Sequence, residues 1–365
     1  MKVAVVHVND GTDVRVSKLC RSLGRLGHET HFVGWDRRPA ETKTLDLAAT
    51  RKHIRVEATR YGKGSALGLG RFAVFLFRTL RTIRPDVVWV VNEEIAFLAL
   101  PFRGLLYRRM ICDIFDSLPD RHSHRRRSLV RLLQGIANAV QARADKVVAT
   151  DETRAGFLTA DRRRIAVIEN FPEDPGETFA RQTPTGEIAV WVGGTLTRNR
   201  GLEQILEAVA DLPDVRIFSA GWAYDSYAAD VFLKDPKVSY HGILTPQEAL
   251  AAAARCDAIL AYYLPLSKNN VFASPNKIYD ALSIGRPVII NREVTVARFV
   301  AENDLGFTCA YDDIASLRTI LMSLRANRRV LDDFATRSRQ LFLSRFNWGR
   351  MEQRMAQILA DLSPR

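Results

Sequence analysis

A glycine-rich segment in the second half of the chain has the residue types of a phosphate-binding turn. Residues 190–202 read VWVGGTLTRNRGL, which is an apolar strand, a glycine pair, a polar loop and a helix start. The backbone at Gly194 can approach a ligand closely, and Arg198 and Arg200 carry forked donors that suit phosphate oxygens. The free N–H groups of the following helix also favour an anion. The segment predicts a diphosphate site, although such turns also occur with solvated arginines and no phosphate.

A second segment, SPNKIYDALSIGRPVII at residues 274–290, has the pattern of a capped helix followed by a buried strand. Ser274 is the expected N-cap, and Asn276 and Lys277 fall in the first turn, where a bound phosphate is favoured. Asp280 lies one turn later on the same face and can accept hydrogen bonds from ribose hydroxyls. The segment predicts a nucleotide-binding helix, and an ordinary capped helix with a surface lysine and aspartate is the alternative.

Three carboxylates follow apolar runs that have the pattern of strands in the first half of the chain. Glu93 and Glu94 come after the run at residues 87–91, and Asp116 comes after the run at residues 110–114. Ligand-binding and catalytic groups gather at the carboxyl ends of parallel strands. These side chains are therefore candidates for acceptor binding or general-base catalysis, and each is also explained as an ordinary helix N-cap.

Arginines cluster in two places in the first half of the chain. Within residues 71–84 they gather on one side of a predicted helix whose other side is largely apolar, and a second cluster precedes the apolar residues at 129–133. The arginines of these clusters are Arg71, Arg78, Arg81, Arg84, Arg125, Arg126 and Arg127. A basic amphipathic helix binds the headgroup layer of an anionic membrane, and the same pattern describes a helix packed on a sheet with a solvated face. Nucleic-acid binding is a third interpretation, but the sequence contains no recognisable nucleic-acid module.

These segments lie in a chain whose apolar runs alternate with helical periodicities. Strands are expected at residues 2–8, 30–33, 86–91, 110–114, 146–149, 165–168, 188–192, 215–219, 238–240, 258–261 and 287–290. Such alternation predicts parallel sheets with helices on both faces. The pattern breaks in the polar, turn-rich residues 170–186, which are the expected linker between two doubly wound α/β domains.

Length and composition agree with this organisation. The chain has 365 residues, a formal net charge of +12 and 47% apolar residues, which favours two globular domains and excludes a disordered or fibrous protein. Its four cysteines lie far apart without a CxxC pair, so we expect a reducing compartment. The opening residues MKVAVVHVNDG form too short an apolar run for an export signal or a spanning helix. No His, Cys and Asp set has metal-ligand spacing, and no metal or other cofactor is expected.

The segments GGTLTRNRGLEQILEAV and SPNKIYDALSIGRPVII, taken together and in this order, resemble the carboxyl-terminal half of the family 4 glycosyltransferases of the GT-B fold. The shorter pieces IENFP, FSAG, YHGIL, ARCDA and FNW fit the same family. The resemblance implies two Rossmann-like, doubly wound α/β domains that face each other across a cleft. Residues 1–170 would bind the acceptor, residues 171–345 would bind the nucleotide-sugar donor, and residues 346–365 would form a helix that crosses back to the first domain.

The resemblance also implies roles for individual positions. Arg200 stands where the family usually has a lysine that contacts the donor diphosphate, with Arg198 as a further cation. Asp280 matches the second acid of the family's E-x7-E pattern, which holds the ribose, whereas the first acid of that pattern falls at Phe272. In the branch with an SPNK motif, Ser274, Asn276 and Lys277 are the natural donor-binding candidates.

In the first domain, the resemblance brings the loop after the first strand to the donor phosphates. Gly11 and Arg15 are the candidates there, and a helix-capping loop is the alternative. Phe115 stands where relatives have a histidine near the reacting sugar.

The resemblance implies a retaining, metal-independent glycosyltransferase of the hexosyltransferase type. Its expected partners are a nucleoside diphosphate sugar, with UDP favoured over GDP, a lipid-linked or polysaccharide acceptor and an anionic membrane surface, but no nucleic acid. The expected location is cytoplasmic, peripheral on the inner face of the cell membrane. Two other classes stay open: a sugar-nucleotide epimerase of the same fold, and a non-catalytic basic module that binds membranes or nucleic acid.

Overall fold

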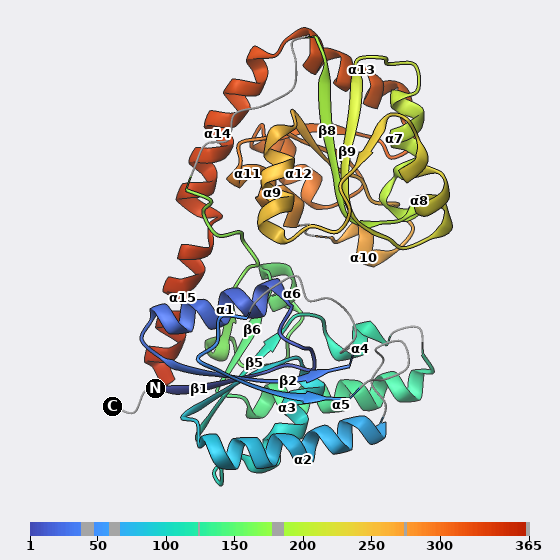
Figure 1. Cartoon of the computed structure of the whole chain (residues 1–365). Coiled ribbons are helices and arrows are strands. Elements are labelled where there is room, and N and C mark those ends of the chain that lie inside the picture. The colour runs from blue at the N-terminus through green and yellow to red at the C-terminus, as the bar shows by residue number, and fades with distance from the viewer. Residues whose placement is uncertain (38–46, 58–65, 123–124, 177–185, 274–275, 363–365) are drawn as a thin grey trace. The chain divides into compact units, whose positions relative to one another are not determined.

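The computed structural model describes residues 1–37, 47–57, 66–122, 125–176, 186–273 and 276–362, and the chain divides into two compact units (Figure 1). The first unit comprises Met1–Asn170 together with Met351–Arg365, and the second unit comprises Phe171–Arg350. The chain therefore passes into the second unit after Asn170 and contributes its last residues to the first.

The first unit is built on a parallel sheet whose order, within the described residues, is β3-β2-β1-β4-β5-β6-β7. The strands are β1 (Lys2–Val6), β2 (Glu29–Asp36), β3 (Arg51–Val56), β4 (Val87–Val91), β5 (Arg109–Ile114), β6 (Lys146–Ala149) and β7 (Ile165–Val167). Val6 at the end of β1 lies opposite Val33 of β2 and Val90 of β4. The chain order reverses between β1 and β4, and ligands bind at the carboxyl ends of strands at such a switch point.

Helices cover both faces of this sheet. They are α1 (Val14–Arg25), α2 (Ala66–Ile83), α3 (Glu93–Ala99), α4 (Leu118–Arg121), α5 (Arg127–Arg143), α6 (Glu152–Gly156) and, from the end of the chain, α15 (Trp348–Leu362). Figure 1 shows α2, α3 and α5 below the sheet and α1 above it. Polar contacts fix α15 to this unit, because Glu352 accepts a hydrogen bond from Ser22 at 2.7 Å and Asp361 pairs with Lys146 at 2.8 Å.

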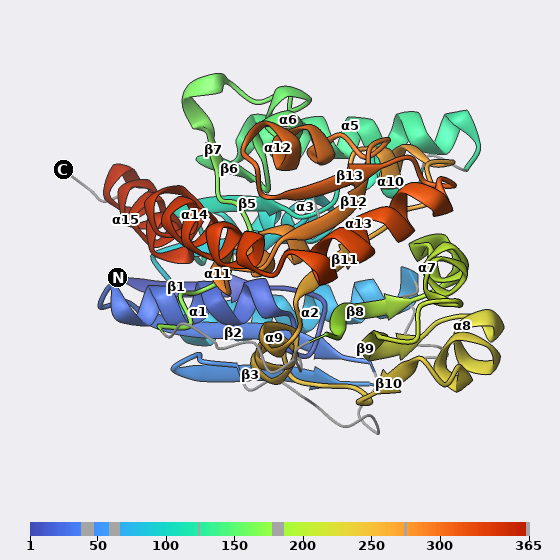
Figure 2. The same ribbon diagram turned by 90° about the horizontal axis from the view of Figure 1, so that it is seen from above.

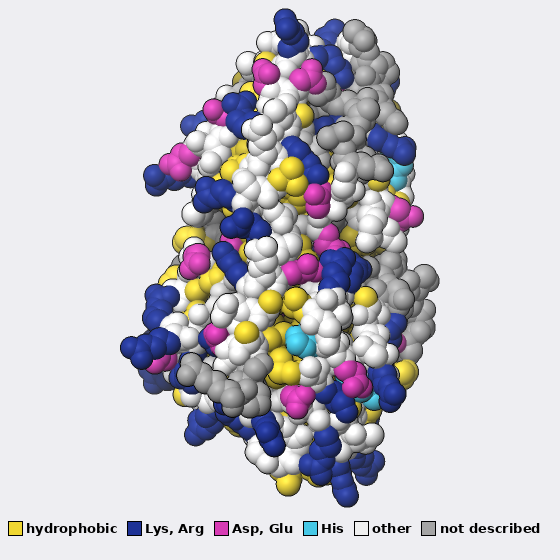
Figure 3. Space-filling model, turned by 90° about the vertical axis from the view of Figure 1, so that its left-hand side faces the viewer, with side chains coloured by type: hydrophobic (Ala, Val, Ile, Leu, Met, Phe, Trp, Pro, Cys, Tyr) yellow, Lys and Arg dark blue, Asp and Glu magenta, His cyan; other side chains and the backbone are white. Residues whose placement is uncertain are grey.

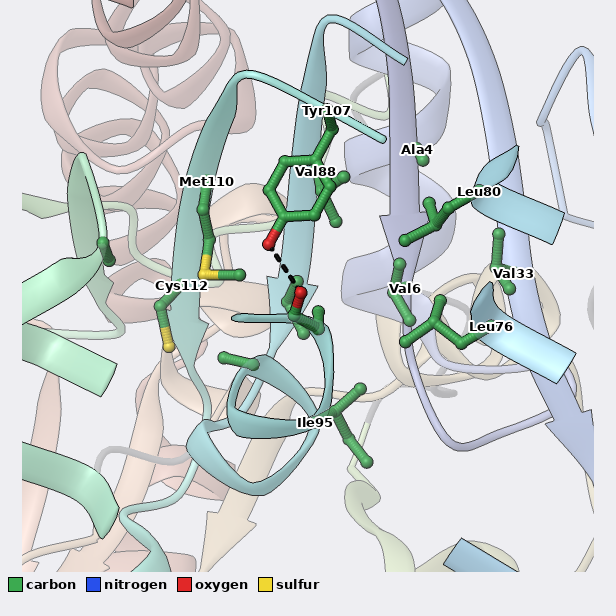
Figure 4. Packing of buried hydrophobic residues seen from close by; sticks show 14 of the residues in the cluster. Ala4, Val6, Val33, Leu76, Leu80, Val88, Ile95, Tyr107, Met110 and Cys112 are labelled. Carbon is green, nitrogen blue, oxygen red and sulfur yellow. Dashed lines mark hydrogen bonds between the residues drawn. The ribbon is translucent and has the colours of Figure 1, made fainter. Parts of the chain in front are cut away.

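The core between the sheet and α2 is apolar and closely packed (Figure 4). Leu76 and Leu80 of α2 point toward Val6 and Val33 of the sheet, and all four side chains are fully buried. Spacing of buried residues by four along α2 is what an amphipathic helix provides. The hydroxyl of Tyr107 donates a 2.9 Å hydrogen bond to the carbonyl of Ala99, so this polar atom is satisfied in the core.

The second unit has a parallel sheet with the order, within the described residues, β10-β9-β8-β11-β12-β13. Its strands are β8 (Ile188–Leu196), β9 (Val215–Ala223), β10 (Val238–Tyr240), β11 (Ala258–Ala261), β12 (Val288–Asn291) and β13 (Gly306–Cys309). Its helices are α7 (Leu202–Val209), α8 (Ser226–Asp230), α9 (Pro246–Arg255), α10 (Lys268–Val271), α11 (Asn276–Ser283), α12 (Val296–Glu302), α13 (Ile314–Ala326) and α14 (Arg329–Arg345). Helices flank both faces of the sheet (Figure 2), and the chain order reverses between β8 and β11. The predicted doubly wound α/β architecture is confirmed in both units.

One face of the surface carries basic and acidic side chains in mixed form. On the face that Figure 3 shows, basic side chains are spread widely with acidic side chains between them. None of the helices in the described ranges is both long and apolar enough to cross a membrane.

Candidate active site

The carboxyl end of β8 is shaped by two glycines. Gly194 lies opposite Gly221 of β9, and a Cβ placed at Gly221 would lie 1.8 Å from the carbonyl oxygen of Gly194. Only glycine permits this approach of the two backbones. Gly194 has a φ of +93° and is exposed, so its backbone is open to solvent where β8 reaches the switch point.

Arg200 lies beside this strand end and has an unsatisfied donor. It closes the short 3-10 turn Arg198–Arg200, and its guanidinium lies over the ring of Tyr263, 4.1 Å from the centroid. The ring is fixed in turn, because the Tyr263 amide donates to Asn291 Oδ1 at 2.8 Å and Asn291 Nδ2 donates to the Tyr263 carbonyl at 3.1 Å. Arg200 Nη1 is buried without a hydrogen-bond partner. A buried unpaired donor costs about 1–3 kcal/mol, which a ligand oxygen would recover.

Lys277 is the second cation of this site. Its Nζ lies 6.0 Å from the centroid of the Tyr263 ring, and a Cβ at Gly194 would lie 3.9 Å from its Cε. Burial, and then the neighbouring charge of Arg200, lower the pKa of Lys277 to about 8, and Asp280 opposes the shift. Neither cation has an ion pair with another described residue. Two half-buried cations that repel each other favour an anion with several charges, such as a diphosphate.

The remaining predicted donor residues differ in their surroundings. Asn276 is exposed at the first position of α11, and Asp280 is half-buried one turn later. Arg198 contacts a different set of groups: Nε and Nη2 donate to Glu203 at 2.9 and 3.2 Å, and the guanidinium lies 4.8 Å from the ring centroid of Tyr227. Ser274 lies outside the described residues. The structure thus brings together Gly194, Arg200 and Lys277, with Asn276 and Asp280 on the same helix as the lysine.

In the first unit, the predicted phosphate contact Arg15 is buried and bonded to protein. Its Nη1 donates to the carbonyl of Ile168 at 2.7 Å, and its Nη2 donates to Asp113 Oδ1 at 3.0 Å. The other oxygen of Asp113 accepts a hydrogen bond from Trp89 Nε1 at 3.2 Å. Burial raises the pKa of Asp113, and the charge of Arg15 opposes this. These contacts join α1 to β4, β5 and the residue after β7.

Gly11 is also enclosed by its own loop. The residue is buried, and its amide donates to Asn9 Oδ1 at 3.0 Å. Asp13 caps α1 by accepting a hydrogen bond from the amide of Val16 at 2.9 Å. The loop therefore has the helix-capping geometry that was the alternative interpretation, and contact of Gly11 or Arg15 with a diphosphate stays a prediction.

Glu93 serves as a structural anchor in this arrangement. It is fully buried and accepts hydrogen bonds from the amide of Leu118 at 2.7 Å and from Gln141 Nε2 at 2.9 Å. Burial raises the pKa of this carboxyl group. The bonds tie α3 to α4 and α5, and a catalytic role for Glu93 stays a prediction.

Glu94 and Asp116 are more open. Glu94 forms a 2.6 Å ion pair with Arg121. The side chain of Asp116 is 62% exposed, and its carboxylate lies 3.9 Å from Arg154. Their catalytic roles stay predictions, with Asp116 the most accessible of the three carboxylates.

Two polar residues at this edge were not singled out from the sequence. His7 is the first residue after β1, and Asn92 follows β4 with a φ of +65° and a ψ of 156°, a region that only glycine enters readily. Asn92 Oδ1 accepts hydrogen bonds from the amides of Phe115 at 2.9 Å and Asp116 at 3.3 Å. Their place in the sequence could have identified them, since each residue directly follows a buried parallel strand at the switch point.

The arginines of the two basic clusters are exposed. Arg71 donates to Glu57 at 2.7 Å, and Arg84 donates to the carbonyl of Leu105 at 2.6 Å. Arg78 and Arg81 lie on α2, and Arg125, Arg126 and Arg127 lead into α5. Among the residues that the structure describes, no group of three or more His, Cys, Asp and Glu side chains could hold a metal ion. The expectation of a metal-independent enzyme stays a prediction.

Two parallel-sheet units, each with a switch point, define the GT-B class of fold, and a cationic pair beside a glycine turn suits an anionic donor. A family model described as a glycosyl transferase 4-like domain matches residues 10–170, and one described as glycosyl transferase-like matches residues 198–360. The chain belongs to the family 4-like glycosyltransferases of the GT-B fold and is a transferase, as the sequence predicted.

Solved structures agree with this fold. Sucrose-phosphate synthase from Thermosynechococcus elongatus is 14% identical, with a TM-score of 0.74 and 99% of each chain covered. HepE of Anabaena in complex with UDP and glucose is 14% identical, with a TM-score of 0.73, and covers 99% of this chain and 100% of its own. WaaG, a glycosyltransferase involved in lipopolysaccharide biosynthesis, is 13% identical, with a TM-score of 0.63, and covers 98% of this chain and 99% of its own. No curated protein matches the sequence.

Proposed function

We propose that this glycosyltransferase transfers a hexose from a UDP-sugar, with retention of anomeric configuration, to a lipid-linked or polysaccharide acceptor in cell-envelope or exopolysaccharide synthesis. The observation that carries the donor part is the Arg200–Lys277 pair, because both cations are half-buried without an ion pair in the described residues. UDP is preferred over other nucleotides by analogy with HepE, whose structures hold UDP and UDP-glucose.

In the proposed reaction these cations act on the leaving group. The bond from the anomeric carbon to the diphosphate oxygen breaks while the acceptor oxygen forms its bond on the same face of the sugar. The acceptor proton passes to the departing diphosphate. Arg200 and Lys277 stabilise the negative charge that develops on this diphosphate, which is electrostatic catalysis by groups already in place. The proposed route needs neither a metal ion nor a strong separate base.

We also propose that the protein binds an anionic membrane surface, and this part rests on the helices that cover one face of the first sheet. Leu67 and Val74 of α2 are 67% and 54% exposed, and Leu132 of α5 is 62% exposed. The exposed arginines of the two basic clusters lie on or beside the same helices. Apolar side chains among arginines suit the headgroup layer of an anionic membrane. Cosedimentation with phosphatidylcholine vesicles, with and without phosphatidylglycerol, tests this part, and binding to neither would refute it.

Calorimetric titration with UDP, GDP and ADP tests the donor site. We expect UDP to bind and Arg200→Ala to weaken binding by about tenfold to a hundredfold, the usual weight of a hydrogen bond to a charged group. Arg298→Ala is the matched control, because that exposed arginine of the same unit pairs only with Glu302 in the described structure. Binding of GDP or ADP alone would refute the UDP preference. Binding of no nucleotide by a folded sample would overturn the proposed function.

A further inference from the structure

His7 occupies the switch point of the first sheet. Its amide donates to the carbonyl of Val33 at 3.1 Å, which extends the pairing of β1 with β2 by one residue. Its ring packs against Phe115, the first residue after β5, with centroids 5.7 Å apart and planes at 62°. The ends of β1 and β5 therefore meet through these two rings at the carboxyl edge of the sheet.

The polar atoms of this imidazole are not satisfied by the protein. Nδ1 is buried without a hydrogen-bond partner, although the residue as a whole is partly exposed. Buried polar atoms without partners are rare in folded proteins and call for an explanation. Burial, with the charges of Arg37 and Arg121 against those of Asp13 and Asp10, lowers the pKa of His7 to about 4. The ring is accordingly neutral at pH 7.

The neutral ring has one N–H donor and one lone pair. In protein backbones a buried unpaired N–H is rarer than a buried unpaired carbonyl, and by the same preference we assign the lone pair to Nδ1 and the proton to Nε2. Since Nδ1 is sealed from solvent, a ligand at this edge meets the ring through Nε2–H. His7 is thus a neutral hydrogen-bond donor of the kind that binds a hydroxyl oxygen.

The surroundings of His7 supply groups that suit a sugar. Asp116 follows Phe115 and exposes its carboxylate, which accepts hydrogen bonds from hydroxyl groups. Asn92 holds the amides of both residues from a strained backbone, and such strain persists where the surrounding structure fixes it, often at functional sites. A donor, an acceptor and an aromatic ring together match the mixed polar and apolar surface of a carbohydrate.

We propose that His7 binds the acceptor sugar by donating a hydrogen bond from Nε2 to one of its hydroxyl groups. This inference rests on the proposed function and assigns part of the acceptor site to the edge formed by β1, β4 and β5. His7 is a binding residue for the acceptor in this proposal. His7 takes no proton from the acceptor.

Binding of octyl glycosides, followed by saturation-transfer NMR and titration, tests the assignment without requiring turnover. The probes are the octyl glucoside, galactoside, mannoside and N-acetylglucosaminide, and UDP is titrated separately. We expect at least one glycoside to bind, His7→Ala to weaken it about fivefold to tenfold, and His7→Gln, which keeps an N–H donor, to restore most of the affinity. UDP affinity should stay within twofold in both variants.

His28→Ala is the matched control, because His28 lies before β2 at the opposite edge of the same sheet. Three outcomes would overturn the proposal: no glycoside binds, His7→Ala binds as the wild type does, or His7→Gln is as weak as His7→Ala. Loss of UDP binding by the wild type would instead overturn the proposed function, since the donor test does not involve His7.

Discussion

Arg15 and Arg200 follow the first strands of their respective sheets, and each guanidinium lies over an aromatic ring, but among the described residues only Arg15 also faces a carboxylate. Arg15 lies at the start of α1 after β1, is buried, and faces the carboxylate of Asp113 at 3.0 Å. Arg200 lies before α7 after β8 and faces an aromatic ring and a second cation. Both loops connect a strand to a helix beside a switch point. The difference is whether the fold supplies a counter-charge.

From this contrast we expect Arg15 to stabilise the fold and Arg200 to be available to a ligand. A buried charge with a partner holds elements together, since removing the partner leaves an uncompensated charge. A half-buried charge without a partner destabilises the free protein, and the binding of an anion removes this cost. Their positions in the fold alone would have predicted that both arginines bind the donor diphosphate.

The largest effect is expected when the buried pair of the first unit is broken. Asp113→Ala leaves the guanidinium of Arg15 buried without its counter-charge, so we expect the first unit to lose about 3–5 kcal/mol of unfolding free energy. Arg200→Ala should not lower stability, because it removes one of two repelling cations. Denaturant unfolding followed by tryptophan fluorescence measures both.

Asp361→Ala is the control for this prediction, because its ion pair with Lys146 lies at the surface of the same unit. We expect this variant to lose no more than about 1 kcal/mol of unfolding free energy, because ion pairs near the surface contribute little. If Asp113→Ala unfolds like the wild type, the Arg15–Asp113 pair does not hold the first unit together, and the predicted contact of Arg15 with the diphosphate gains support.

A second, smaller effect sharpens the description of the cationic site. The pKa of Lys277 is lowered to about 8, so the free protein carries this charge at pH 7 and has largely lost it at pH 9. A bound diphosphate raises this pKa again, and binding then takes up a proton. The affinity for UDP should therefore fall by about tenfold between pH 7 and pH 9.

Lys277→Met is the matched variant for the pH series, since it keeps the length of the side chain without a titrating group. Its affinity for UDP should be lower than that of the wild type at pH 7 and flat to pH 9. A wild-type affinity that is also flat would show that Lys277 does not contact the nucleotide.

Much of the fold could be predicted from the sequence because buried parallel strands are continuous apolar runs with helical periodicities between them. The strand β3, with the sequence RKHIRV, was missed. It is an edge strand that exposes much of its length and lacks an apolar run. The glycine turn and the SPNK helix were found from local residue types, and the structure brings Gly194, Arg200 and Lys277 together.

The partners of the charged residues could not be predicted in the same way. Asp113 is separated from Arg15 by 98 positions, and Tyr263 lies on a different strand end from Arg200. Whether an arginine is paired depends on these distant contacts. His7 was missed for a related reason, since its buried and unpaired nitrogen is visible only after the ends of β1 and β5 are in place.

Arg198 provides the third case of the comparison and the smallest expected effect. It lies in the same turn as Arg200 but pairs with Glu203 at the surface, where both side chains are about half exposed. Exposed ion pairs contribute little to stability, so Arg198→Ala should change the melting temperature by no more than about 2 °C. Its effect on UDP affinity should stay below threefold, because its Nε and Nη2 already donate to Glu203. A tenfold loss in calorimetry would show that Arg198 leaves Glu203 for the diphosphate. An ion pair with an exposed carboxylate would then not mark an arginine as structural. Only a pair with a buried carboxylate such as Asp113 would do so.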